Sequence, residues 1–405
     1  MKILVADDDP LERRIVANLL AKCGHEVMQC SDGEMAWQLV QSEGIRLVVS
    51  DWLMPKLTGI DLCHKIRGAS LDRYVYVILC TSKGEKADFI QGMDAGADDF
   101  IVKPVHIDDL RVRVRAGERI LNLERNLSDK NQELEVAHAA LQTAYEHIQD
   151  DLKAAAWVQM NLLPPPELKA LGVACNWRFR PSSYISGDIF NFFAVDSKHV
   201  GFYLLDVSGH GVPAAMCSMA LSLELAPDGR NRTPLRRYDR KANSYEAVEP
   251  SDVITELNTR FQTRDDRYFT MTYGVLNAQT SVLRLAQAGN PNPVLIERRG
   301  KATALSSGGM PVGLWPDMVF DSIEVPFQCG DRLVLYSDGV SECANADEVE
   351  FGDARLLEYL KATAHQPLEE TLNGLEKELE AWRGSTDFAD DVSVLALEFM
   401  GEHIQ

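Results

Sequence analysis

The sequence lacks several features that mark whole classes of protein. No apolar run approaches the roughly 18 residues that a membrane-spanning helix needs. The N-terminal MKILVADDDP has no apolar segment of the secretory type before its first acids. The eight cysteines are scattered without a C-x-x-C pair, which argues against a zinc ribbon or a disulfide framework. These absences predict a cytoplasmic protein with no membrane span.

Positive charge is scarce as well. The chain has 41 Lys and Arg against 61 Asp and Glu, for a net charge of −20. Such an excess repels nucleic-acid phosphates and anionic lipids, so we expect no direct contact with either. Many acids stand in short clusters, as metal ligands do, rather than in an acidic tail. At roughly 150 residues per domain, the length of 405 predicts two or three domains.

The first 120 residues alternate short apolar runs with amphipathic stretches. The apolar runs predict strands at 3–6, 26–30, 46–50, 75–80 and 99–102. The amphipathic stretches predict helices at 11–23, 34–41, 60–66, 86–93 and 107–121. Five such repeats predict a doubly wound α/β domain with a five-stranded parallel sheet. Ligands of such sheets bind beyond the carboxyl ends of the strands.

Polar residues stand at those strand ends. They are Asp7 and Asp8 after the first strand, Asp51 after the third, Thr81 after the fourth and Lys103 after the fifth. Three carboxylates at one rim repel each other unless a cation lies between them, and oxygen ligands suit Mg²⁺. One such aspartate alone would more simply be a helix cap or a loop acid. The five positions together favour a ligand site.

The segments ILVADDDP, VVSDWLMPKLTG, LCTS and FIVKPV resemble the motifs of a two-component response-regulator receiver domain. The resemblance implies that Asp51 is phosphorylated by a sensor histidine kinase or a phosphotransfer protein. It implies that Thr81 and Lys103 contact the phosphoryl group, whose charge Mg²⁺ and Lys103 would neutralise. The implied Mg²⁺ ligands are Asp7, mainly through bound water, Asp8, Asp51 and the main-chain carbonyl of Leu53.

Residues 121–163 predict a long helix, because neither Gly nor Pro occurs between Gly117 and Pro164. Apolar residues recur there every seven positions, at Leu127, Leu134, Leu141, Ile148, Ala155 and Leu162. This spacing is typical of a coiled-coil seam and predicts a parallel homodimer. The alternative is a single amphipathic helix that lies on a domain. Pro164 and the two prolines after it end the helix.

The remaining 240 residues predict an α+β layered sandwich. Strands are expected at 176–180, 190–195, 200–206, 270–277, 282–287, 294–298, 332–337 and 392–399. Helices are expected at 213–225, 251–264, 354–363 and 368–383. The stretch 227–250 is rich in Arg and Lys and predicts a solvated loop, with docking of an acidic partner as the alternative.

Aspartates end or flank the strands of this part. They are Asp188, Asp206, Asp338 and the pair Asp390-Asp391. Carboxylates without His or Cys ligands favour Mg²⁺ or Mn²⁺ over Zn²⁺. Two such ions clamp a phosphoryl group and activate water.

The order Asp188, DVSGHGVPAAM, GDRLVLYSDGVSE and DDVS resembles the SpoIIE-type branch of the metal-dependent serine/threonine phosphatase (PPM) superfamily. The resemblance covers roughly 155–400 and includes AWVQMNLLP, which looks like that family's regulatory helix. It implies two Mn²⁺ or Mg²⁺ ions and an α-β-β-α sandwich. The implied metal ligands are Asp206 as the bridge, the carbonyl of Val207, Asp338 and Asp390, with Asp188 positioning water and phosphate near the first metal.

Two residues depart from that family's pattern. Asn191 stands where a second Asp is usual, and Asn290 replaces the His of an AGH motif. Neither change removes a metal carboxylate, so we expect an active enzyme with altered rate or substrate fit.

The predicted domains are a receiver at 1–120, a helical linker at 121–163 and a phosphatase at 164–405. Together they predict a response regulator whose output dephosphorylates phosphoserine or phosphothreonine. In the family the substrate is commonly a STAS-type anti-sigma-factor antagonist. The alternative is a non-catalytic adaptor that binds a sigma factor or an anti-sigma regulator. A decayed domain of that kind would be expected to lose Asp206, Asp338 or Asp390, and this chain has all three.

Overall fold

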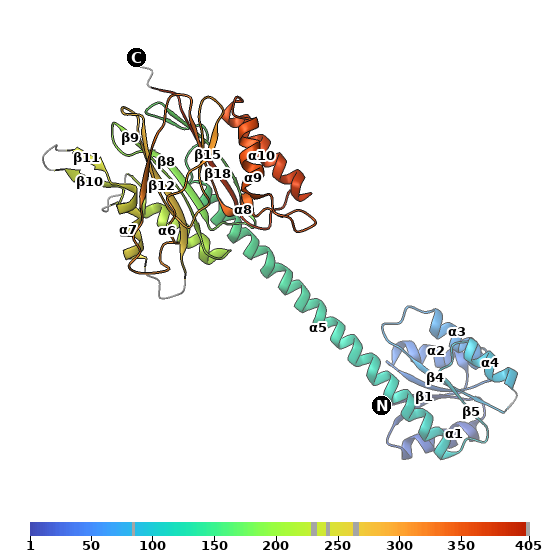
Figure 1. Cartoon of the computed structure of the whole chain (residues 1–405). Helices are drawn as coiled ribbons and strands as arrows, with labels where there is room; N and C mark the ends of the chain where they lie inside the picture. The colour runs from blue at the N-terminus through green and yellow to red at the C-terminus, as the bar shows by residue number, and fades with distance from the viewer. Residues whose placement is uncertain (83–85, 228–232, 240–243, 262–266, 402–405) are drawn as a thin grey trace. The chain divides into compact units, whose positions relative to one another are not determined.

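The computed structural model describes residues 1–82, 86–227, 233–239, 244–261 and 267–401 (Figure 1). The chain divides into two compact units, Met1–Ala144 and Tyr145–Gln405. Among the described helices, none combines the length and the apolar character needed to cross a bilayer.

The first unit is built on a parallel sheet with helices on both faces. Its strands are β1 (Lys2–Ala6), β2 (Glu26–Cys30), β3 (Leu47–Asp51), β4 (Tyr76–Thr81) and β5 (Asp99–Val102), in the order β2-β1-β3-β4-β5. Its helices are α1 (Pro10–Lys22), α2 (Gly33–Ser42), α3 (Gly59–Gly68), α4 (Lys86–Asp94) and the start of α5. Apolar side chains are buried on both faces of the sheet, so the predicted doubly wound fold is confirmed.

Short polar side chains start three of these helices. The Asp9 carboxylate accepts hydrogen bonds from two N–H groups in the first turn of α1, and the Asp32 carboxylate accepts one from the Met35 N–H of α2. Thr58 and Asp61 form a capping box at α3. Each cap fixes the point at which the loop after β1, β2 or β3 ends and the next helix begins. The short loops at the carboxyl edge of the sheet are therefore held in place.

A single helix, α5 (Ile107–Met160), runs from the first unit into the second. Its start is part of the first core, where Leu110, Val114 and Leu121 are buried. The predicted seam residues farther along are 57–70% exposed; they are Leu127, Leu134, Leu141 and Ile148. The long helix is therefore confirmed, whereas pairing of two copies stays a prediction. Leu162 is not part of the helix, which ends at Met160; it packs against the core of the second unit.

The second unit stacks two antiparallel sheets. The first has the order β16-β13-β12-β9-β8 and the second β15-β14-β17-β18-β7-β6. Their strands are β6 (Lys169–Ala170), β7 (Val173–Arg180), β8 (Asp188–Ala194), β9 (His199–Val207), β12 (Phe269–Asn277), β13 (Val282–Ala288), β14 (Val294–Ile296), β15 (Ala302–Ala304), β16 (Ser322–Pro326), β17 (Arg332–Tyr336) and β18 (Val392–Phe399). Large apolar residues from both sheets, including Phe190, Tyr273 and Leu395, form one buried core.

Helices cover both outer faces of this sandwich (Figure 1). On the first sheet, α6 (Val212–Glu224) packs against β8 and β9, and α7 (Pro250–Arg260) packs against β12 and β13. On the second sheet lie α9 (Gly352–Ala362) and α10 (Leu368–Arg383), while the short α8 (Asp338–Ser341) follows β17. The layers are helix, sheet, sheet and helix, so the predicted α-β-β-α sandwich is confirmed.

The prediction of a structureless loop at 227–250 is wrong for its described part. Strands β10 (Arg236–Asp239) and β11 (Ser244–Ala247) form an antiparallel hairpin there. The rings of Tyr238 and Tyr245 meet edge to face, and the Arg236 guanidinium lies over the Tyr245 ring. These cross-strand contacts offset the low strand propensity of the basic sequence. Residues 228–232 and 240–243 of the stretch lie outside the described residues.

Candidate functional site

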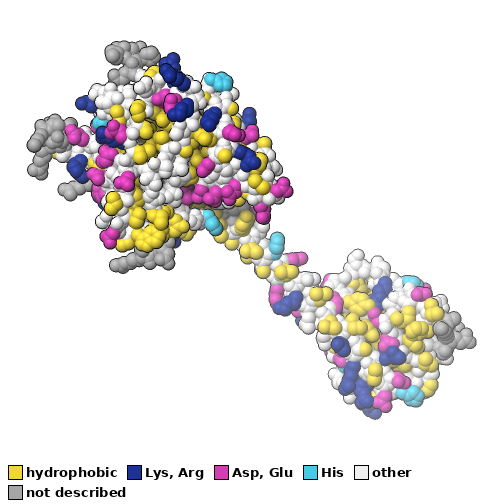
Figure 2. Space-filling model, viewed as in Figure 1, with side chains coloured by type: hydrophobic (Ala, Val, Ile, Leu, Met, Phe, Trp, Pro, Cys, Tyr) yellow, Lys and Arg dark blue, Asp and Glu magenta, His cyan; other side chains and the backbone are white. Residues whose placement is uncertain are grey.

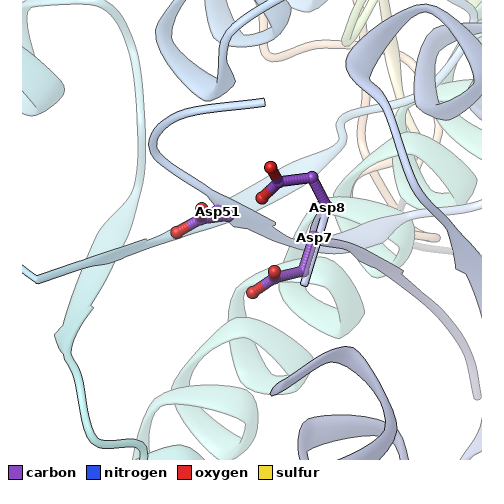
Figure 3. A group of neighbouring side chains, drawn as sticks. All are labelled: Asp7, Asp8 and Asp51. Carbon is purple, nitrogen blue, oxygen red and sulfur yellow. The ribbon is translucent and has the colours of Figure 1, made fainter. Parts of the chain in front are cut away.

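Three carboxylates meet at the rim of the first sheet. Asp7 and Asp8 follow β1, and Asp51 ends β3, the strand beside it (Figure 3). One carboxylate oxygen from each lies within 4.8 Å of the others. Asp7 is buried, Asp51 is half-buried and Asp8 is exposed. The predicted convergence of these three residues is therefore present, and hard oxygen donors open to water suit Mg²⁺.

Lys103 lies beside these acids, directly after β5. Its Nζ is 2.8 Å from an Asp51 oxygen and 3.0 Å from an Asp7 oxygen, and it also pairs with Glu12. Burial disfavours the ammonium, yet the hydrogen bonds to these three carboxylates outweigh it and raise the pKa of Lys103. Burial also raises the pKa of Asp7, against the pull of Lys103. Lys103 is thus a fixed positive charge that the acids hold at the rim.

A pocket of about 240 Å³ opens over this group. Its lining residues are Asp9, Glu12, Asp51, Trp52, Leu53, Thr81, Ser82 and Lys103. Thr81 ends β4 and is 4% exposed. The pocket brings the Asp51 carboxylate together with the Lys103 ammonium and the hydroxyl groups of Thr81 and Ser82, which is the chemistry needed to receive a phosphoryl group.

In the second unit, the predicted acids come from both sheets of the sandwich. Asp188 and Asp206 stand opposite each other on β8 and β9. Asp338 follows β17 and Asp390 precedes β18, and these two strands are antiparallel neighbours. The aspartates at all four positions therefore lie at one end of the sandwich, although they come from distant parts of the sequence.

Burial and mutual repulsion raise the pKa values of three of these acids. Burial, and then the neighbouring Asp206 charge, raise the pKa of Asp188 well above its ordinary value. Burial and the charges of Asp338 and Asp390 raise the pKa of Asp206 to about 7. Burial and Asp390 raise the pKa of Asp338 as well. Such a cluster is costly to ionise without a cation among its members.

The residues present fit divalent cations. Asp188 is 1% exposed, and its Oδ2 has no hydrogen-bond partner among the described residues, although the Ser337 and Ser393 hydroxyls approach the same carboxyl group. Within the described part of the chain, only the group in the first unit brings three acidic oxygens within 4.8 Å.

Asp206, Asp338 and Asp390 line a pocket of about 640 Å³, whereas the buried Asp188 is not among its lining residues. It is lined by Ser182, Ser183, Asp206, Ser208, Gly209, His210, Tyr268, Thr270, Pro311, Asp338, Ala389 and Asp390. Gly209 and Gly211 have φ of 91° and 78°, so the turn between β9 and α6 needs glycine on both sides of His210. This turn places the exposed His210 in the pocket. The Val207 carbonyl is beside Gly187, where a Cβ would lie 2.9 Å from it.

Asp391 organises the segment that leads to Asp188. Its Oδ1 accepts hydrogen bonds from the Ser182 N–H at 2.7 Å and the Ser182 hydroxyl at 2.9 Å. Its Oδ2 accepts from the Ser186 hydroxyl at 2.6 Å and the Gly187 N–H at 2.9 Å. The sequence pointed to the Asp390-Asp391 pair, but this role depends on contacts more than 200 residues apart and has no local signal.

Gln159, in the last turn of α5, also forms hydrogen bonds with the segment 182–188. It is 1% exposed, its Nε2 donates to the Ser186 carbonyl at 2.7 Å, and its Oε1 accepts from the Ser186 N–H at 3.0 Å. Nε2 also lies 3.4 Å from the Asp188 carbonyl. The predicted regulatory segment thus touches the backbone that carries Asp188.

Asn191 and Asn290, the two residues that depart from the SpoIIE-type pattern, form hydrogen bonds with nearby residues. The Asn191 oxygen accepts from the Phe192 N–H, and its amide group reaches the Tyr203 hydroxyl. Asn290 accepts from the Thr270 hydroxyl and donates to the Leu204 carbonyl at 3.3 Å. Because Thr270 pairs with Asp206 across β12 and β9, Asn290 supports a strand next to the acids.

Comparisons with known proteins agree with this division. Residues 196–400 match the family described as Stage II sporulation protein E (SpoIIE), and residues 3–115 match the response regulator receiver domain. The SiaA-PP2C domain of Pseudomonas aeruginosa resembles the second unit in fold, with 20% identity, a TM-score of 0.53, and 63% of this chain and 98% of that chain covered.

The curated relatives match the first unit. The "Probable transcriptional regulator ycf27" of Cyanophora paradoxa is 42% identical over 115 residues, which are 28% of this chain and 47% of the relative. The "Chemotaxis protein CheY homolog" of Campylobacter jejuni is 37% identical over 106 residues, which are 26% and 82% of the two chains. The chain thus spans about half the length of the ycf27 relatives that it matches.

Proposed function

The chain belongs to the SpoIIE family, and we propose that it is a response regulator whose output is a metal-dependent protein serine/threonine phosphatase. The observation that carries the proposal is the group of buried acids in the second unit. Burial and mutual repulsion raise the pKa values of Asp188, Asp206 and Asp338, and one Asp188 oxygen is buried without a partner among the described residues. A bound cation would offset the free-energy cost of ionising these acids, so they are suited to bind one.

Each acid has a proposed role at the phosphatase site. Two Mg²⁺ or Mn²⁺ ions would neutralise phosphoryl charge and activate water when bound. Their ligands would be Asp206 as the shared one, the Val207 carbonyl, Asp338 and Asp390. Asp188 would orient water and phosphate from its buried position. Asp391 and Gln159 act indirectly, because they fix the backbone of 182–188 on which Asp188 stands.

At the first site, Asp51 is the proposed phosphoacceptor. Its oxygen faces the pocket that Thr81 and Lys103 line, where both can contact an incoming phosphoryl group. Mg²⁺, when bound, would neutralise charge during the transfer. Its ligands would be Asp8, Asp51, the Leu53 carbonyl and, through water, Asp7. The phosphodonor would be a sensor histidine kinase or a phosphotransfer protein, which places the proposed activity in the cytoplasm.

The proposed substrate is a phosphorylated STAS-type anti-sigma-factor antagonist. This choice rests on the resemblance to the SpoIIE-type branch. We further propose the domain boundaries 1–120, 121–163 and 164–405. A parallel homodimer through the exposed apolar residues of α5 would join the two activities.

A non-catalytic adaptor is the competing function, and hydrolysis separates the two. The full-length protein would be assayed with p-nitrophenyl phosphate and with a serine-phosphorylated STAS-domain protein, in Mn²⁺ and in EDTA. Hydrolysis that requires Mn²⁺ and disappears in Asp206→Asn supports the phosphatase. Binding of the STAS-domain protein without any turnover would support the adaptor instead.

A further inference from the structure

An apolar surface adjoins the pocket of the second unit. We call it the rim patch and define it as Val212, Met216, Leu223, Tyr268, Met310 and Trp315, whose exposed fractions range from 38% to 64%. Figure 2 shows hydrophobic side chains gathered over the region of α6 and α7. Exposed apolar side chains that gather in one patch, rather than standing singly, mark an interaction surface.

The first half of the rim patch is a stripe on α6. Val212, Met216 and Leu223 are spaced by four and seven residues, so they share one side of the helix. The opposite side is buried in the unit through Ala214, Ala215 and other small or apolar residues. No charged residue occurs between Val212 and Leu223. The stripe starts two residues after His210, which lines the pocket.

The second half of the rim patch includes the loop 310–315, which buried hydrogen bonds hold in place. The Asn258 side chain, 1% exposed, accepts from the Gly313 N–H at 2.8 Å and donates to the Trp315 carbonyl at 2.9 Å. Val312 and Phe269 exchange two backbone hydrogen bonds. The loop is therefore fixed while the Met310 and Trp315 side chains stay exposed, and Pro311 between them lines the pocket.

An ion pair joins the end of α6, which carries the stripe, to the end of α7, which holds the loop. Arg260, at the end of α7, lies 2.6 Å from Glu224, the last residue of α6, next to Leu223. Asn258, which holds the Trp315 loop, is on the same last turn of α7. The stripe and the loop are thereby tied to neighbouring helix ends, and Pro311 of the loop and Tyr268 line the pocket itself.

We propose that the rim patch docks the folded phosphoprotein substrate, by binding an apolar surface beside its phosphoserine. This inference rests on the proposed phosphatase function. A phosphoserine carries a charge of about −1.5 to −2 and the chain carries −20, so net charge does not attract the substrate. Uncharged apolar contacts avoid that repulsion, and Trp and Met are favoured at the centres of protein interfaces.

The test compares a small substrate with a folded one. Full-length wild type, Trp315→Ala and Met216→Ala would be assayed in Mn²⁺ on p-nitrophenyl phosphate and on a serine-phosphorylated STAS-domain protein. The matched control is Met400→Ala, which removes a 51% exposed side chain just beyond the end of β18 that is opposite Asp390. Melting temperatures would confirm that each variant folds.

For Trp315→Ala we expect kcat/KM on the folded substrate to fall about tenfold through KM, as for a central interface residue. For Met216→Ala we expect about a threefold loss. Activity on p-nitrophenyl phosphate, and both activities of Met400→Ala, should stay within twofold.

Three results would overturn the inference. Equal losses on both substrates would mean that the patch only supports the pocket. Unchanged turnover of the folded protein would mean that the substrate does not touch it. A change of oligomeric state by light scattering, with KM unchanged, would assign the patch to a second copy of the chain. Failure of wild type to hydrolyse even p-nitrophenyl phosphate would instead contradict the proposed function.

Discussion

The Gln159 side chain and the Ser186 backbone exchange two hydrogen bonds, of 2.7 Å and 3.0 Å, in a fully buried setting. Gln159 lies in the last turn of α5, the helix that begins within the proposed phosphoacceptor domain. Ser186 lies two residues before Asp188. A rotation or shift of the end of α5 would therefore move the backbone that carries a proposed catalytic acid.

Replacing Gln159 with Ala should lower kcat for phosphoserine hydrolysis by at least tenfold, because a small displacement of a catalytic group is costly. The Tm should fall by only a few degrees. Gln132→Ala, an exposed glutamine of the same helix, is the matched control and should behave as wild type. Equal kcat in both variants would show that the contact is not needed to position Asp188.

The pKa of Asp206, about 7, predicts how metal-free stability depends on pH. A folded-state pKa above the unfolded value of about 3.9 means that the acid favours folding while protonated. That contribution is complete below about pH 4 and is lost as the pH rises through 7. In EDTA, the Tm of wild type should therefore fall between about pH 4 and 7, and Asp206→Asn should flatten part of that fall.

Metal should reverse this trend, because a bound cation stabilises the ionised acids. At pH 8, Mn²⁺ should raise the Tm of wild type by several degrees and that of Asp206→Asn much less. If EDTA and Mn²⁺ give the same Tm at pH 8, the cluster does not bind the ion.

Phosphotransfer should label a single residue. Incubation with a small phosphodonor and Mg²⁺ should give a base-labile acyl phosphate, which Asp51→Asn abolishes because the accepting carboxylate is gone. Asp206→Asn is the control and should be labelled as wild type. Label that persists in Asp51→Asn would place the phosphoacceptor at another residue.

The exposed seam of α5 predicts dimers. Leu134→Lys combined with Leu141→Lys places charges where two helices would meet, and should give monomers by light scattering. Phosphatase activity should then no longer respond to Asp51 phosphorylation, while Mn²⁺ binding is unchanged. A wild type that is monomeric in both phosphorylation states, with regulation intact, would rule out the paired coil.

The sequence was sufficient where the pattern is local. Alternating apolar runs predicted the parallel sheet, and the acids at strand ends, such as Asp51 and Asp338, were located by their position after apolar runs. It was not sufficient where the role depends on distant partners. Asp391 bonds to residues more than 200 positions away, and Gln159 to Ser186 across 27. The β10–β11 hairpin was missed because its basic composition predicted a solvated loop. The contact between the Tyr238 and Tyr245 rings, which stabilises the hairpin, has no signal in the composition.

Regulation of the phosphatase by the receiver is tested most directly by phosphoserine release from the full-length protein in Mn²⁺, with Asp51 phosphorylated and unphosphorylated. The substrate would be the serine-phosphorylated STAS-domain protein, and Asp206→Asn would serve as the inactive control. A phosphatase regulated by its receiver should show turnover that needs Mn²⁺ and Asp206 and that changes severalfold between the two states of Asp51. Turnover that is the same in both states, or the same in Asp206→Asn as in wild type, would contradict this proposal.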